Sequence, residues 1–162
     1  LHKTLTIADL HADALLWRRN PEKRHKRGHV DLPRLRDGGV DIQIFSAVTK
    51  SPRGLNFDGN SADAPDDITT LAQVQLWPLR TWNSIYERAA FQAQRLQDVE
   101  KNTSNDLIIA RTQSDLDSLK AETGCEVIRA DLADNTAARA RFFCARRAKL
   151  CESCGYLRVS RT

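Results

Sequence analysis

Apolar, β-branched stretches alternate with helical stretches along most of the chain, and this alternation limits the fold more than any other feature. Three stretches are typical of buried strands: "TLTIADL" (4–10), "VDIQIFSAV" (40–48) and "DLIIA" (106–110). Each is followed by a helical pattern, near 31–37, 66–101 and 114–122. The order β, α, β, α, β, α predicts an α/β fold with a parallel sheet and helices packed outside it.

Local signals indicate where the helices begin and break. Asp31 precedes the first helix, which has a proline in its first turn and two glycines at its end. Pro78 interrupts the helical region 66–101. Thr112 and Asp115 have the spacing of a capping box before the last helix. These signals do not depend on the apolar pattern, and they predict helices in the same three segments.

The second helical region carries an apolar stripe that we expect to face the core: Ile85, Ala89, Ala93 and Leu96. We interpret three nearby aromatic residues as packing residues, with an aromatic substrate shelf as the alternative: Trp77, Trp82 and Tyr86. The basic run "WRRNPEKRHKRG" is typical of a solvated loop. Residues 49–67 are rich in turn-forming residues and predict a long loop.

A histidine and an aspartate follow the first predicted strand at a spacing of two. His11 and Asp13 can point to the same side if the strand or its extended end reaches residue 13. In parallel α/β folds the active site lies beyond the carboxyl ends of the strands. An imidazole nitrogen and a carboxylate oxygen at that place are suitable ligands for zinc. The alternative is a capping aspartate beside a partly exposed histidine.

Several segments together resemble the membrane dipeptidase family of zinc peptidases, especially its bacterial members. They are "ADLHADALLW", "GHVDLPRLRDGGVDIQIFSAV", "TKSPRGLN" and "DDITTLAQ", within residues 1–123. The resemblance implies the N-terminal part of an amidohydrolase-type (β/α)8 TIM barrel, incomplete in this chain. It also implies a two-zinc centre in which a metal-bound hydroxide attacks the peptide carbonyl of a dipeptide. His11 and Asp13 then correspond to ligands of one zinc ion.

The chain departs from the family pattern after residue 124. The resemblance implies a bridging glutamate near 130–136, where the sequence is "ADLADNT", and two later histidine ligands, whereas the last histidine is His29. We therefore expect one weak, partial zinc site and no dipeptide hydrolysis by this polypeptide alone. A different amidohydrolase is an alternative, because the His-x-Asp pattern is shared among such hydrolases.

Residues 125–162 differ in composition from residues 1–124. They hold 8 Lys and Arg against 4 Asp and Glu, whereas residues 1–124 hold 17 of each. All four cysteines lie there: Cys125, Cys144, Cys151 and Cys154. We interpret this tail as an atypical segment, consistent with a frameshift, and expect neither structural zinc nor nucleic-acid binding. Propensity favours a helix over 135–150. The alternative function is a non-catalytic truncated protein that binds a partner through its basic tail.

The sequence contains no methionine, and we expect Leu1 to lie inside a longer product. The resemblance implies a membrane-anchored or periplasmic protein with an anchor upstream of Leu1. No run of about 18 apolar residues and no signal-peptide pattern occurs in the chain. The dipeptide preference and the oligomeric state do not follow from the sequence.

Overall fold

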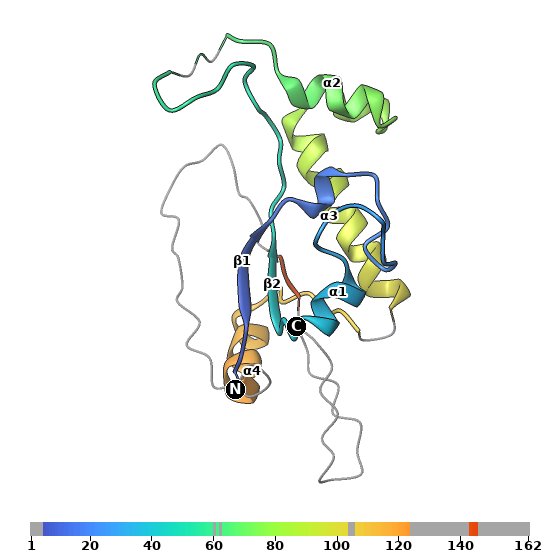
Figure 1. Ribbon diagram of the computed structural model, residues 1–162, viewed down its shortest axis with the longest axis vertical. Coiled ribbons are helices and arrows are strands. Elements are labelled where there is room, and N and C mark those ends of the chain that lie inside the picture. The colour runs from blue at the N-terminus through green and yellow to red at the C-terminus, as the bar shows by residue number, and fades with distance from the viewer. Residues whose placement is uncertain (1–4, 60, 62, 104–105, 124–142, 146–162) are drawn as a thin grey trace.

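The computed structural model describes residues 5–59, 61, 63–103, 106–123 and 143–145. Two parallel strands organise it: β1 (Ala8–Ala12) pairs with β2 (Ile42–Phe45), in the register Ala8↔Ile42 and Ala12↔Phe45, with an irregularity between these pairs (Figure 1). The connection between them contains a 3-10 turn, η2 (Ala14–Leu16), and the helix α1 (Leu32–Asp37). The predicted parallel pairing of the first two strands is therefore confirmed.

Among the described residues, four helical segments follow β2: α2 (Asp67–Val74), the 3-10 turn η3 (Leu79–Thr81), α3 (Ile85–Asn102) and α4 (Gln113–Thr123). In Figure 1, α2 lies beyond the upper ends of β1 and β2, which are their carboxyl ends, and α3 runs alongside the sheet. The predicted break is confirmed, because Pro78 lies between α2 and α3 and caps η3.

The predicted helix caps are also present. The Asp31 side chain accepts a hydrogen bond from the Arg34 backbone N–H at 2.9 Å, which satisfies a free donor in the first turn of α1. Before α4, the Asp115 N–H donates to Thr112 Oγ1 (3.1 Å), and the Thr112 N–H donates to the Asp115 carboxylate (2.9 Å). This reciprocal pair is the capping box that the sequence predicts.

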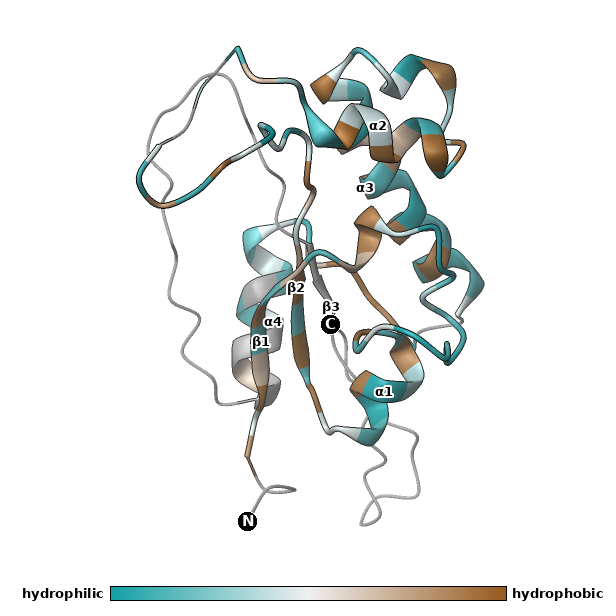
Figure 2. Cartoon of the chain, turned by 45° about the horizontal axis from the view of Figure 1, so that its top comes forward, coloured by the Kyte–Doolittle hydropathy of each residue, from teal (hydrophilic) through white to brown (hydrophobic). Residues whose placement is uncertain are grey.

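The core lies between the sheet and the helices α1 and α3. Its buried members are Leu15, Leu32, Leu35, Phe45, Leu96, Val99, Leu107 and Ile109. In Figure 2, hydrophobic colour runs through β2 and recurs at intervals along α3, which packs beside it. Burial of such side chains is the main favourable term in folding.

The predicted stripe on α3 is only partly correct. Leu96 is buried, but Ile85 is 53% exposed, and the buried positions of α3 are Arg88, Gln92, Leu96 and Val99. The buried face is thus rotated from the predicted one and begins with two polar residues. Apolar periodicity could not find it, because those two side chains are buried for their hydrogen bonds. Tyr86 is 75% exposed, so its expected packing role is wrong.

The predicted third strand is wrong. Residues 106–110 lie outside the sheet and cross the core, into which Leu107 and Ile109 point. The Ile109 N–H donates to the Glu100 carboxylate of α3 at 2.7 Å instead of pairing with a strand. Leu107 and Ile109 are buried, as predicted for a strand. The Ile109 N–H, however, finds its acceptor in the Glu100 side chain and not in the backbone of a neighbouring strand.

The third strand of the sheet is β3 (Phe143–Ala145), which pairs antiparallel with β2 in the order β1-β2-β3. This contradicts the expectation of three parallel strands, and it contradicts a helix through 143–145. The rest of the predicted helix 135–150 lies outside the described residues. Within the part of the chain that the structure describes, no helix is long and apolar enough to cross a membrane.

Candidate functional site

His11 and Asp13 lie at the carboxyl end of β1, where the sequence places them. His11 belongs to the strand, and Asp13 follows its last residue and precedes η2. Their side chains are 70% and 43% exposed. Because β2 is parallel to β1, the carboxyl ends of both strands lie at the same edge of the sheet. This is the edge at which α/β folds hold their ligands.

The two side chains converge. His11 Nε2 lies 3.2 Å from Asp13 Oδ1. The distance suits an ion pair, but Asp13 Oδ1 is shielded from solvent and has no partner in hydrogen-bond geometry among the described residues. A shielded carboxylate oxygen without such a partner is costly. In a tetrahedral zinc shell with bonds of about 2.0–2.2 Å, two ligand atoms lie about 3.3–3.5 Å apart. The observed separation is close to that value, so the pair fits two positions of such a shell.

Ser46 is a third polar residue at this edge. It follows the last residue of β2, and its hydroxyl lies 3.2 Å from His11 Nδ1. When His11 Nδ1 carries the proton and donates to Ser46 Oγ, the lone pair of Nε2 is free for a metal ion. Sequence reasoning missed Ser46. No signal in the sequence pointed to it, because the predicted second strand, 40–48, included Ser46, whereas β2 ends at Phe45.

The other sequence-predicted parts of a metal centre do not come together here. Among the described residues, no group of three His, Cys, Asp or Glu side chains is placed to hold a metal ion. The segment 130–136, where the resemblance implies a glutamate, lies outside the described residues, as do Cys125, Cys151 and Cys154. The described residues therefore provide two candidate ligands, which is fewer than a stable zinc site needs.

A buried arginine supports the loop that follows β2. The Arg88 side chain is 2% exposed and forms an ion pair with Asp66, the N-cap of α2. It also donates to the backbone carbonyls of Thr49 and Thr81, both at 2.7 Å. Burial by itself would raise the pKa of Asp66. Hydrogen bonds from the Ser51 backbone and from Arg88 outweigh burial, so the pKa lies below its ordinary value.

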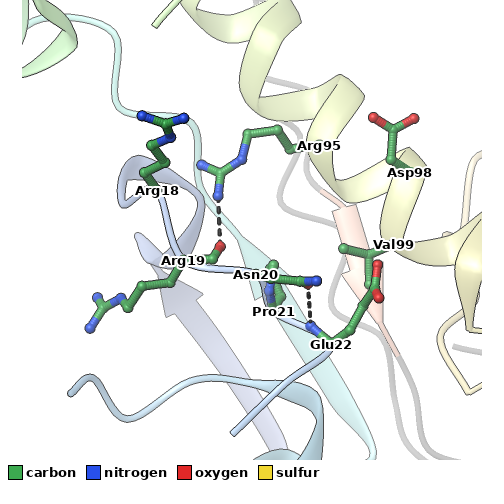
Figure 3. A pocket seen from close by; sticks show the side chains of 8 residues that line it. All are labelled: Arg18, Arg19, Asn20, Pro21, Glu22, Arg95, Asp98 and Val99. Carbon is green, nitrogen blue, oxygen red and sulfur yellow. Dashed lines mark hydrogen bonds between the residues drawn. The ribbon is translucent and has the colours of Figure 1, made fainter. Parts of the chain in front are cut away.

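A second arginine of α3 supports the loop that follows β1. The Arg95 guanidinium donates to the carbonyls of Leu15, Trp17 and Arg19, and Figure 3 shows the last of these bonds. An open cavity of about 250 Å³ lies beside it, lined by Arg18, Arg19, Asn20, Pro21, Glu22, Arg95, Asp98 and Val99. Neither His11 nor Asp13 lines this cavity, so it is separate from the candidate metal site.

No protein-family model matches the chain, and no curated protein and no solved structure matches it. The relation to zinc dipeptidases therefore stays a prediction that depends on the motifs of residues 1–123.

Proposed function

We propose that this chain is the N-terminal part of a zinc-dependent dipeptidase with an amidohydrolase-type (β/α)8 barrel, and that His11 and Asp13 are two of its metal ligands. The observation that carries the proposal is the 3.2 Å separation of His11 Nε2 and Asp13 Oδ1 at the carboxyl edge of two parallel strands. The motif "HVDLPRLRDGGV", which forms α1 and its cap at Asp31, supports the same family.

The chemistry of the two donors agrees with the proposal. A neutral imidazole nitrogen and a carboxylate oxygen are both common zinc ligands. Zinc, when bound, acts as a Lewis acid for hydrolysis of an amide bond. The residues of this chain position the donors, because His11 belongs to β1, Asp13 begins the turn η2 directly after it, and Ser46 contacts the far side of the imidazole. Because two ligands bind zinc much more weakly than four, we expect weak binding and no measurable dipeptide hydrolysis by this polypeptide alone.

Equilibrium dialysis of zinc against the 162-residue protein tests the proposal. All four cysteines are first replaced by serine, so that thiolates do not contribute to binding. We expect weak binding of one zinc ion that His11→Ala and Asp13→Asn each abolish. His29→Ala is the matched control, because His29 is exposed and belongs to the loop before α1, not to β1 or β2.

Two results would contradict the proposal. One is zinc binding that survives both His11→Ala and Asp13→Asn. The other is the complete absence of zinc binding by the folded protein at millimolar metal. Robust dipeptide turnover by the unmodified chain, lost in His11→Ala, would instead show that the metal centre is complete within these 162 residues.

A further inference from the structure

Three large apolar side chains are exposed where α2 ends and η3 begins. Val74 is the last residue of α2, and Leu76 and Leu79 follow it in the sequence. Each of the three is about three quarters exposed. A single exposed leucine is common on a protein surface and needs no explanation. Three such residues between positions 74 and 79 place apolar surface at one end of a helix, and we call this region the α2 end.

Leu76 has a backbone conformation that leucine rarely adopts. Its φ is +55°, in the left-handed region. The Leu76 N–H donates to the Gln73 carbonyl at 3.0 Å, and the Trp77 N–H donates to the Ala72 carbonyl at 2.8 Å. Leu76 therefore stands at the position where helices commonly end with glycine. A leucine there strains the backbone, and its exposed side chain gains little burial in return.

A basic segment is tied to the same end of α2. Residues 17–28 hold six Lys and Arg residues against one glutamate. The Arg18 N–H donates to Gln75 Oε1 at 2.6 Å, and Gln75 Nε2 donates to the Leu16 carbonyl at 3.0 Å. The loop that follows η2, in blue, accordingly lies below α2 in Figure 1. The exposed apolar residues and the basic segment are therefore neighbours.

The basic segment offers both charge and an aromatic side chain to a partner. Lys23, Lys26 and Arg27 are exposed and form no ion pair with any described residue. Trp17 is 43% exposed, and the Arg19 guanidinium carbon lies 5.6 Å from the centroid of its ring. Tryptophan and arginine side chains are typical of the interface between lipid headgroups and acyl chains.

We propose that the α2 end and the basic segment together bind the surface of an anionic lipid bilayer. Apolar side chains and Trp17 enter the headgroup region, and the Lys and Arg side chains remain beside the lipid phosphates. Binding of this kind gains from buried apolar area and from attraction to anionic lipids. The proposal does not depend on the proposed function.

The combination of side chains favours a bilayer over other anionic partners. A nucleic acid is bound through its phosphates by Lys and Arg, and it gives exposed valine and leucine side chains nothing to pack against. An acidic protein can bury them only with a surface of complementary shape. A bilayer accepts apolar side chains that project from the fold without such complementarity.

The first measurement is sedimentation of the 162-residue protein with lipid vesicles. We expect binding to vesicles of phosphatidylcholine and phosphatidylglycerol, weakening with salt, and little binding to phosphatidylcholine alone. Each basic residue at the surface strengthens binding about fivefold, so Lys23→Gln with Lys26→Gln should lower the affinity by about tenfold or more. Lys50→Gln with Arg53→Gln is the matched control, because it removes the same charge from exposed positions of the loop after β2.

The second measurement compares vesicle affinity with stability in Leu76→Gly. Glycine relieves the left-handed backbone, so the urea midpoint of the free protein should rise. The loss of the apolar side chain should lower the affinity for anionic vesicles by about 3- to 10-fold. Phe57→Ala is the control, since Phe57 is fully exposed but belongs to the loop before α2, and it should leave the affinity unchanged.

The third measurement locates the contact by fluorescence. Brominated lipids should quench Trp17, whereas Trp77 is 3% exposed and should be little affected. Trp17→Phe should remove most of the quenching while the protein still sediments with the vesicles.

Four outcomes would overturn the proposal. Equal losses in the two double variants would show attraction by overall charge and not by the basic segment. Unchanged affinity in Leu76→Gly would exclude insertion of the α2 end. Quenching that persists in Trp17→Phe would place the contact elsewhere. Binding of RNA or DNA by a protein that does not bind anionic vesicles would assign the basic segment to a nucleic acid.

Discussion

The loops that follow β1 and β2 are held to the same helix in two different ways. Arg95 of α3 binds the loop after β1, and Arg88 of α3 binds the loop after β2. The two arginines are seven residues apart, which is two turns, so they project from neighbouring positions on one side of the helix. Each arginine donates hydrogen bonds to backbone carbonyls of the loop that it contacts.

The difference between the two arginines lies in how their charge is compensated. The Arg88 side chain is almost fully buried and has a carboxylate partner, Asp66. Arg95 is partly exposed beside an open cavity, and among the described residues no carboxylate forms an ion pair with it. Carbonyl dipoles and solvent are sufficient for a charge near water, whereas a buried charge needs an opposite charge. The contact of α3 with the loop after β2 therefore includes an ion pair, and its contact with the loop after β1 does not.

Loss of Arg88 should have the largest effect on stability. Arg88→Met leaves Asp66 without its partner and the Thr49 and Thr81 carbonyls without their donor. We expect the free energy of unfolding to fall by about 3–5 kcal/mol, as for other broken buried pairs. Urea unfolding followed by circular dichroism measures the change. Arg80→Met, which breaks the exposed pair with Glu87, is the control and should cost at most about 1 kcal/mol. Equal effects of the two variants would contradict the comparison.

Loss of Arg95 should have a smaller and more local effect. Arg95→Met removes the donor to the carbonyls of Leu15, Trp17 and Arg19, and water can replace it in part. We expect a loss of about 1–3 kcal/mol. Limited digestion with trypsin should cut the basic segment 18–27 faster than in the wild type. Unchanged cutting there would show that the loop after β1 is fixed by other contacts, such as the bond from the Leu32 N–H to the Pro21 carbonyl.

Acid should weaken the loop after β2 through Asp66. Because the pKa of Asp66 is lower in the folded protein than in the unfolded chain, the unfolded chain binds more protons in acid. The stabilisation is therefore complete above about pH 4, the ordinary range of an aspartate, and is lost as the pH falls through the lower folded value. Asp66→Asn should flatten this acid dependence in urea titrations from about pH 7 down to about pH 2.5. It should not remove all of it, since the pKa values of Glu100 and Asp115 are also lowered. An unchanged dependence would contradict the assignment to Asp66.

Local signals in the sequence were sufficient to place helix ends and to identify the first two strands, but not their bounds, since 4–10 and 40–48 were predicted and the strands are Ala8–Ala12 and Ile42–Phe45. The cap at Asp31, the break at Pro78 and the box at Thr112 each depend on neighbouring residues, and each was predicted correctly. His11 and Asp13 converge as predicted, but not through an extended strand, because β1 ends at Ala12 and Asp13 has a non-extended backbone (φ −88°, ψ 27°) as the N-cap of η2. The wrong predictions concern contacts between distant residues. Ile109 bonds Glu100 instead of a strand, and β3 comes from a segment for which propensity favoured a helix.

The buried polar residues of α3 show why the remainder of the site was not predictable. Arg88 and Gln92 look like surface residues in a hydropathy pattern, and only the position of β2 shows what they bind. Ser46 is likewise one of several hydroxyl residues until its distance to His11 is known. The contacts of Arg88, Gln92 and Ser46 could be recognised only once the position of β2 beside β1 was known.

The two arginines of α3 also bear on how the chain folds. Arg95 bonds residues 76 to 80 positions earlier in the sequence, and Arg88 bonds Thr49, 39 positions earlier. Contacts of such long range form late, because closing each loop costs conformational entropy before the bond returns any energy. The helix can form early from its own cap at Ser84, but it can be fixed in place only when both strands have arrived. Sheet, loops and helix should therefore be lost together when the chain unfolds, as one cooperative unit.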